Sequence, residues 1–131
     1  MAKVLLIEDD QDQVLLYSTK FQLEGYDIVS APDGFLGIKM AEKEKPDIIL
    51  LDLVMEKLDG LAVLKELKSR PAIKDIPVLL FTNLAKKDLA EEAQKMGAIG
   101  YILKSNYTPR EVVEKVSEIL QQKLKKFAKH A

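Results

Sequence analysis

Five polar side chains in this sequence stand directly after short apolar runs, and their types suit phosphoryl chemistry. They are Glu8, Asp9, Asp52, Thr82 and Lys104. Carboxylates that lie close together without a cation raise one another's pKa. A bound divalent ion that prefers oxygen ligands would keep them ionised, and Mg²⁺ is the first candidate. A carboxylate beside Mg²⁺ and an ammonium group is a plausible nucleophile toward phosphorus, because the cations neutralise the entering phosphoryl oxygens and the hydroxyl donates a hydrogen bond.

Asp52 is the first choice for the nucleophile, because it ends the most apolar of the runs. These residues also have simpler interpretations. An acidic pair such as Glu8-Asp9 often forms a helix cap and a solvated turn, with Asp9 or Asp10 as the cap, and Asp52 alone could be a buried, paired carboxylate. Spacing alone does not decide between a reactive site and these structural roles.

Five short apolar runs alternate with longer segments of helical period. The first, third and fourth runs are apolar without alternation, which is typical of strands buried on both faces of a parallel sheet. The second and fifth runs are mixed in polarity and are expected at the edges. The predicted strands are residues 4–7, 27–31, 47–51, 76–81 and 99–103.

Cap and stop signals mark the helices between these strands. Gly25 and Gly97 are predicted to end two helices, and Asp59 is predicted to cap a third. The last helix opens with a capping box over residues 108–111 that has Pro109 at its first helical position. The apolar stripe of this helix is Val113, Val116, Leu120, Leu124 and Phe127.

This β-α alternation predicts an α/β fold, a doubly wound parallel sheet with right-handed crossovers and helices on both faces. In such a fold, ligands bind beyond the carboxyl ends of the strands, and the five polar side chains above stand at those ends. We therefore expect them to meet at one rim of the sheet.

Composition limits the classes of protein to consider. The chain has 131 residues, of which 47% are apolar, enough for one core and too apolar for a disordered chain. The 20 basic and 21 acidic residues are too balanced for a nucleic-acid-binding surface. Cysteine is absent, which excludes disulfides, thiolate metal sites and thiol nucleophiles, and no apolar run approaches a membrane span. We expect a soluble cytoplasmic protein.

Charge is unevenly distributed along the chain. Residues 121–131 hold four lysines and no acid, whereas residues 1–120 hold 16 basic and 21 acidic residues, a net charge of about −5. We therefore divide the chain into one domain at 1–120 and a basic C-terminal extension of the last helix at 121–131.

Five motifs, in order and spacing, resemble the receiver domain of bacterial two-component response regulators. The resemblance covers roughly residues 3–120. It implies a flavodoxin-like (βα)5 fold whose five-stranded parallel sheet has the order 2-1-3-4-5. The motifs are Glu8-Asp9, the run 46–52, Asp59-Gly60, Phe81-Thr82 and the run 100–104.

The resemblance also implies a phosphoacceptor and a metal site. Asp52 would accept the phosphoryl group. Asp9 and Asp52 would bind Mg²⁺ directly, joined by the backbone carbonyl of Val54, while Glu8 would act through water. No other cofactor is expected.

The remaining site residues also follow from the resemblance. Thr82 and Lys104 would hold the phosphoryl oxygens, and Thr82 and Tyr101 would form the switch, with Tyr101 changing its rotamer. Taken alone, Tyr101 is an edge-strand aromatic that covers the core. Two positions depart from the family pattern, because Asn83 replaces a small residue and Ser105 replaces a proline. A cis bond without proline costs about 3 kcal/mol, which favours a trans or altered turn before Ser105.

The function expected from the resemblance is that of a stand-alone receiver, which is no enzyme beyond promoting its own phosphorylation and dephosphorylation. It would take its phosphoryl group from a sensor histidine kinase or a phosphotransfer protein. Only eleven residues follow position 120, so output would pass to a downstream protein partner without direct DNA binding or membrane insertion. A phosphorylation-dependent homodimer is also compatible with this function.

Two alternatives to a stand-alone receiver stay open, and a third is disfavoured. A pseudo-receiver would bind proteins without phosphorylation, and Asn83 and Ser105 are its support. The chain could also be the receiver fragment of a longer regulator. A Mg²⁺-dependent phosphatase with an aspartate nucleophile would need a general acid two residues after Asp52. This chain has Val54 at that position, which disfavours a phosphatase.

Overall fold

Five parallel strands form the central sheet of the computed structural model, which describes residues 2–54, 59–83 and 86–130, with side chains as far as residue 125. The sheet order is β2-β1-β3-β4-β5, as the family resemblance implied, with the two mixed strands at the edges. The β4 strand begins two residues later than predicted and includes Thr82 as its last residue. The strands are β1 (Lys3–Ile7), β2 (Asp27–Ala31), β3 (Ile48–Leu51), β4 (Val78–Thr82) and β5 (Gly100–Leu103).

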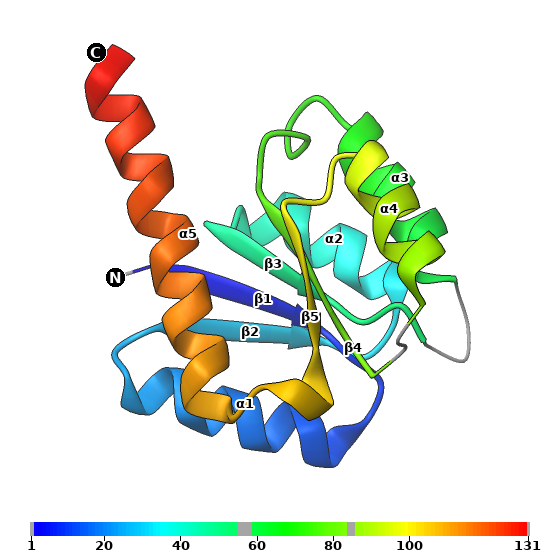
Figure 1. Cartoon of the computed structure of the whole chain (residues 1–131), viewed down its shortest axis with the longest axis vertical. Helices are drawn as coiled ribbons and strands as arrows, with labels where there is room; N and C mark the ends of the chain where they lie inside the picture. The colour runs from blue at the N-terminus through cyan, green and yellow to red at the C-terminus, as the bar shows by residue number, and fades with distance from the viewer. Residues whose placement is uncertain (1, 55–58, 84–85, 131) are drawn as a thin grey trace.

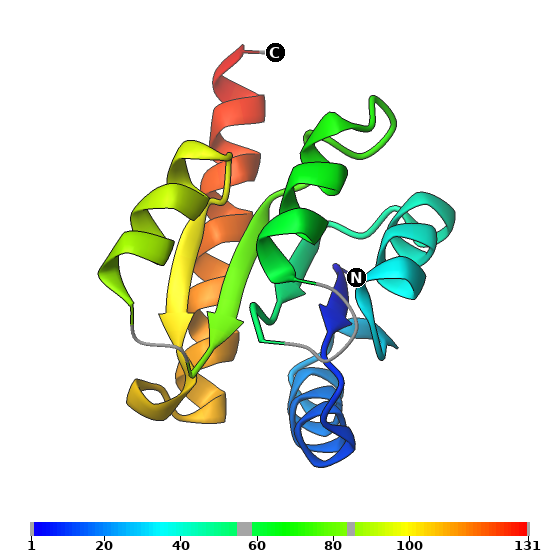
Figure 2. The same ribbon diagram turned by 90° about the vertical axis from the view of Figure 1, so that its right-hand side faces the viewer.

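Helices cover both faces of the sheet (Figures 1 and 2). The α1 and α5 helices pack on one face, and α2, α3 and α4 pack on the other. A short 3-10 turn, η1 (Lys104–Asn106), joins β5 to α5. The helices are α1 (Gln11–Leu23), α2 (Gly34–Glu44), α3 (Gly60–Ser69), α4 (Lys87–Lys95) and α5 (Pro109–His130).

The central strands supply side chains to two separate apolar layers. In β1, Val4 and Leu6 face α1 and α5, whereas Leu5 and Ile7 face the other three helices, and all four are fully buried. Because alternate residues of a strand point to opposite faces, a strand covered on both sides must be apolar throughout. Burial on both faces therefore explains why the first, third and fourth strands are uninterrupted apolar runs in the sequence.

The predicted cap residues end or begin the helices as expected. Gly25 and Gly97 have φ angles of 90° and 103°, in the left-handed region that favours glycine. Asp59 caps α3 by accepting a 3.1 Å hydrogen bond from the backbone N–H two residues later. The capping box of α5 is reciprocal, because the Thr108 N–H donates to Glu111 Oε1 at 3.0 Å and the Glu111 N–H donates to Thr108 Oγ1 at 3.2 Å.

The apolar stripe of α5 leaves the body of the protein before the helix ends. Val113 and Val116 are buried and Leu120 is half-buried, but the Leu124 side chain is 68% exposed. The side chain of Phe127 lies outside the described residues. Figures 1 and 2 show the last turns of α5 projecting beyond the sheet. In the described part of the chain, no helix combines the length and apolarity needed to cross a membrane.

The start of α3 lies against the backbone that follows β3. A Cβ atom at Gly60 would lie 2.4 Å from the Leu53 Cα and 2.9 Å from the Asp52 carbonyl oxygen. The Gly60 N–H also donates to the Leu53 carbonyl at 3.3 Å. Backbone atoms cannot move aside as the end of a flexible side chain can, so only glycine allows this approach.

We predict that Gly60→Ala lowers the free energy of unfolding by about 1 to 3 kcal/mol, because the added methyl group forces the two backbone segments apart. Urea unfolding of the variant and the parent protein measures the difference. Ala62→Ser, on the exposed side of the same helix, is the matched control and should change stability by less than about 0.5 kcal/mol. Equal stability of Gly60→Ala and the parent would contradict the close approach.

Candidate functional site

The carboxyl ends of β1, β3, β4 and β5 surround a hollow of about 410 Å³. Six of the seven predicted site residues line this hollow. The exception is Tyr101, which lies in β5 and packs against the apolar layer beneath α2, α3 and α4. The lining residues are Glu8, Asp9, Asp10, Gln13, Asp52, Val54, Thr82, Asn83 and Lys104.

Backbone pairing places the acidic groups side by side. The N–H of Asp52 donates to the carbonyl of Ile7 at 3.1 Å, which extends the pairing of β3 with β1 by one residue. The N–H of Glu8 donates to the carbonyl of the last β2 residue at 3.0 Å. Carboxylate oxygens of Glu8, Asp9 and Asp52 consequently lie within 4.8 Å of one another.

The cap of α1 is Asp10 rather than Asp9. Asp10 Oδ1 accepts hydrogen bonds from the N–H groups of Asp12 at 2.9 Å and Gln13 at 3.3 Å. The sequence left both aspartates open for this role. Because Asp10 satisfies the helix N-terminus, Asp9 remains with the acidic cluster.

Lys104 places an ammonium group between two of the buried acids. Its Nζ atom lies 2.6 Å from Glu8 Oε2 and 3.4 Å from Asp52 Oδ2, and its side chain is 8% exposed. The described peptide bonds are all trans, including the bond before Ser105, which agrees with the trans turn expected without proline. The family's proline is therefore not needed to bring this lysine to the acids.

Two aromatic side chains support Lys104 from within the α1 and α5 layer. Its Nζ atom lies 4.9 Å from the ring centre of Phe81, within the range of a cation–π contact. Tyr17 meets Phe81 edge to face, with ring centres 4.7 Å apart. Sequence reasoning gave neither Phe81 nor Tyr17 a role in supporting the lysine. The available signal was the position of Phe81 directly before Thr82, one residue from the hollow.

Charge is not balanced inside the hollow. Burial raises the pKa of Glu8 from 4.5 to about 7, although the hydrogen bond from Lys104 opposes the shift and the charge of Asp52 adds to it. Burial also raises the pKa of Tyr101, with a further contribution from the charge of Asp52. Among the described residues, four carboxylates and one ammonium group line the hollow, so the site favours additional positive charge, either a proton or a cation.

The rim of the hollow is shaped by the residues around Asp52 and Thr82. Asp52 Oδ1 accepts a 3.1 Å hydrogen bond from the N–H of Val54, whose side chain is 57% exposed. Thr82 is completely buried at the end of β4, and the next residue, Asn83, is exposed at the rim. Asn83 thus lies at the rim, where the family usually has a smaller residue.

Fold and site together define a receiver domain. The chain belongs to the response regulator receiver domain family, which it matches over residues 4–117. Its structure resembles the chemotaxis protein CheY4 of Vibrio cholerae, with a TM-score of 0.84, 26% identity, and coverage of 90% of this chain and 98% of that one. It also resembles the BeF3-activated N-terminal receiver domain of Klebsiella pneumoniae RstA, with a TM-score of 0.82, 27% identity, and coverage of 90% and 97%.

Curated relatives are longer proteins. The chain is 35% identical over 120 residues to the alkaline phosphatase synthesis transcriptional regulatory protein PhoP of Bacillus subtilis, covering 92% of this chain and 49% of PhoP. It is 32% identical over 133 residues to the DNA-binding dual master transcriptional regulator RpaA of Synechocystis, covering 100% and 55%. The chain therefore spans about half the length of these relatives.

We predict that the metal-free protein loses stability as the pH rises from about 5 to about 8. The folded-state pKa of Glu8 is raised, so the stability gained from its protonation is fully present below its unfolded pKa and is lost as the pH passes about 7. Thermal melting in a chelating buffer measures this slope. Glu8→Gln should flatten it, whereas Glu92→Gln, at an exposed position, should leave it unchanged. A slope that persists in Glu8→Gln would show that another group causes it.

Proposed function

We propose that this receiver is a phosphorylation-controlled switch that accepts a phosphoryl group on Asp52. The donor is the phosphohistidine of a sensor histidine kinase or of a phosphotransfer protein. The observation that carries the proposal is the convergence of three carboxylates around the buried ammonium group of Lys104 at the carboxyl edge of the sheet. Such a cluster is costly to fold, which is typical of a reactive site.

In the proposed transfer, a carboxylate oxygen of Asp52 attacks phosphorus. An O–P bond forms while the N–P bond to the donor imidazole breaks, and the imidazole leaves with that electron pair and gains a proton from water. Lys104, already 3.4 Å from Asp52, would bind one phosphoryl oxygen, and the Thr82 hydroxyl would donate a hydrogen bond to another. The contribution of the chain is to position its nucleophile and to neutralise charge.

The donor set fits Mg²⁺, which prefers oxygen ligands and is bound through carboxylates. Asp9, Asp52 and the backbone carbonyl of Val54 would hold the ion, with Glu8 acting through water. When bound, the ion supplies positive charge that keeps the carboxylates ionised and neutralises the entering phosphoryl oxygens. The raised pKa of Glu8 agrees with this fit, because burial, with a smaller contribution from the charge of Asp52, disfavours the ionised carboxylate that a bound cation would stabilise.

We propose that phosphorylation changes the position of the Thr82 side chain and, in response, the rotamer of Tyr101. Thr82 is buried at the end of β4, and Tyr101 lies on the neighbouring edge strand β5, in register with the middle of β4. A phosphoryl group on Asp52 would draw the Thr82 hydroxyl toward it, and Tyr101 would change its rotamer in response. A downstream protein partner would then bind the altered surface around β5, and the receiver would promote only its own phosphorylation and dephosphorylation.

Two arrangements of the whole protein are compatible with this function. We propose a stand-alone cytoplasmic receiver, with a domain at 1–120 and a basic extension at 121–131, that acts through a protein partner rather than through DNA. The greater length of PhoP and RpaA supports the alternative, in which the chain is the receiver segment of a longer regulator.

A second candidate function is that of a pseudo-receiver that binds proteins without phosphorylation. The position of Asn83 at the rim of the hollow favours it, because a larger polar side chain there would narrow the approach to Asp52. Phosphorylation of the purified protein distinguishes the two functions.

We predict that acetyl phosphate and Mg²⁺ add a single phosphoryl mass to the protein and that Asp52→Asn abolishes the addition, since an amide is a poor nucleophile. Intact-mass spectrometry in mildly acidic solution measures both. Asp88→Asn, at an exposed position in α4, is the control and should be phosphorylated like the parent. An Asp52→Asn protein that still gains the phosphoryl mass would exclude Asp52 as acceptor, and an inert parent would favour the pseudo-receiver.

We predict that Asp9→Ala weakens Mg²⁺ binding by roughly tenfold or more and nearly abolishes phosphorylation, because it removes a charged ligand from the cluster. Calorimetric titration with Mg²⁺ measures the affinity. Asp12→Asn is the control, since this nearby acid is exposed and does not line the hollow, and it should bind Mg²⁺ like the parent. Similar Mg²⁺ affinities in the parent and Asp9→Ala would show that Asp9 is not a ligand.

A further inference from the structure

In the described part of the chain, the ammonium group of Lys104 contacts two acids and the face of an aromatic ring. A lysine ammonium group has three N–H donors. The Nζ atom lies 2.6 Å from Glu8 Oε2, 3.4 Å from Asp52 Oδ2 and 4.9 Å from the ring centre of Phe81. A cation at that distance over a ring is attracted to it, so the Phe81 ring is the third partner of the ammonium group.

The Phe81 ring is held in place by its surroundings. Phe81 is completely buried in the apolar layer that α1 and α5 cover. Tyr17, from α1, meets this ring edge to face, with ring centres 4.7 Å apart and ring planes at 87°. Aromatic pairs prefer this geometry, so the contact favours one orientation of the ring toward Lys104.

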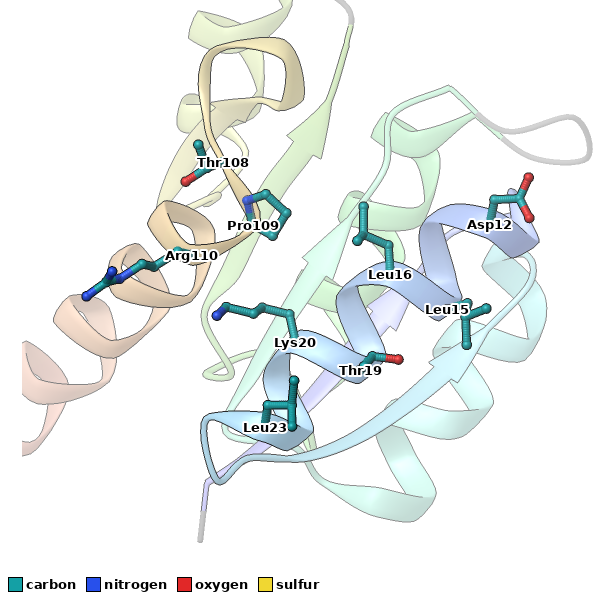
Figure 3. A pocket seen from close by; sticks show the side chains of 9 residues that line it. All are labelled: Asp12, Leu15, Leu16, Thr19, Lys20, Leu23, Thr108, Pro109 and Arg110. Atoms are coloured by element: carbon teal, nitrogen blue, oxygen red, sulfur yellow. The ribbon is translucent and has the colours of Figure 1, made fainter.

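Tyr17 lies on the inner side of α1 and is 4% exposed. Burial raises the pKa of its phenol, while the charge of Lys104 lowers this pKa and the charge of Glu8 raises it. The phenol is therefore within electrostatic reach of both groups. Leu16 and Thr19 of the same helix are instead exposed, and they line an open pocket of about 650 Å³ between α1 and the start of α5 (Figure 3). Tyr17 thus connects α1 to the site, whereas these two residues face solvent.

The ring differs from the two acids in what the proposed transfer does to it. Asp52 loses its free carboxylate as the O–P bond forms, and Glu8 also interacts with the bound cation. The attraction of Lys104 to both acids therefore changes during the reaction. The attraction of a cation to a ring face comes from the permanent quadrupole of the ring and is the same before and after the transfer. Phe81 is therefore the partner that can hold the ammonium group while it exchanges an acid for a phosphoryl oxygen.

We propose that Phe81 and Tyr17 are positioning residues for the phosphoryl transfer, which fix the Lys104 ammonium group where a phosphoryl oxygen on Asp52 will lie. This inference rests on the proposed function. The chain that follows the lysine gives it little support, because Lys104 begins the three-residue η1 turn, whose other two residues are exposed. The position of the ammonium group therefore depends on side-chain contacts rather than on the turn.

The rate of phosphorylation by acetyl phosphate at saturating Mg²⁺ tests the positioning role. Phe81→Leu keeps an apolar side chain in the layer but removes the ring face, and it should slow phosphorylation by about 3- to 30-fold. Phe21→Leu is the matched control, because Phe21 is also completely buried in this layer and meets Tyr26 edge to face, with ring centres 5.3 Å apart. Among the described residues, only the Phe81 ring makes a cation–π contact. Phe21→Leu should therefore lower the melting temperature, as Phe81→Leu does, and keep the rate of the parent.

A double-mutant cycle separates the positioning of Lys104 from a general loss of packing. In a Lys104→Ala background, Phe81→Leu should slow phosphorylation no further, since no ammonium group remains to be positioned. Tyr17→Leu should slow phosphorylation by about 2- to 10-fold, and Tyr17→Phe should restore the rate because it retains the edge-to-face contact. Leu16→Ala, on the outer side of α1, is the control for this helix. Equal slowing by Phe81→Leu in both backgrounds, or equal slowing by Phe21→Leu, would overturn the proposal.

NMR spectroscopy of the lysine ammonium protons tests the contact without phosphorylation. Protons over the face of an aromatic ring are shielded, so the Lys104 ammonium signal of the metal-free protein, assigned by its loss in Lys104→Ala, should move downfield in Phe81→Leu. Phe21→Leu should leave it in place. A signal at the same position in the parent and Phe81→Leu would overturn this inference alone. A parent protein whose signal moves as expected but which gains no phosphoryl group would overturn the proposed function and, with it, the role in phosphoryl transfer.

Discussion

The contact between Lys104 and the buried acids is the constraint on which the arrangement of the site depends. Glu8 and Asp52 are almost completely buried, and two neighbouring carboxylates in that position are tolerated only beside positive charge. The lysine directly follows the edge strand β5, and β4 lies between β5 and the acidic ends of β3 and β1, so β4 needs a buried, uncharged end. Thr82 meets that requirement, and Phe81 supports the ammonium group from the other face of the sheet.

The parallel pairing of the strands brings Lys104 and the buried acids together. All five strands end at the same edge, so residues that follow them meet without a loop having to carry them there. The apolar layers on both faces then fix the register of the central strands, because a shift by one residue would exchange the side chains of the two layers. The site is therefore built directly on the ends of the core strands, and the close approach of Gly60 packs the start of α3 against the backbone of Asp52 and Leu53.

Much of this arrangement could be predicted from the sequence, because strands buried on both faces and residues that follow them are local patterns. Such patterns predict the strands, their edge positions, the caps at Asp59 and Thr108 and the meeting of five site residues. The sixth, Val54, was implied only by the family resemblance. Contacts between distant segments could not be predicted in the same way. The choice of Asp10 over Asp9 as the cap depends on the path of the chain after β1, and the support of Lys104 by Phe81 depends on the packing of β4 against β5.

The two distances at Lys104 also bear on the division of roles between the acids. Its ammonium group lies 2.6 Å from Glu8 but 3.4 Å from Asp52, so Glu8 holds the lysine in place and Asp52 is the less strongly engaged partner. A carboxylate that donates its electron pair to phosphorus should not already be committed to a short ion pair, because breaking that pair would add to the barrier. Asp52 also has an oxygen fixed by the Val54 N–H, which orients the carboxylate. These distances support the proposed division of roles, in which Glu8 positions the lysine and Asp52 accepts the phosphoryl group.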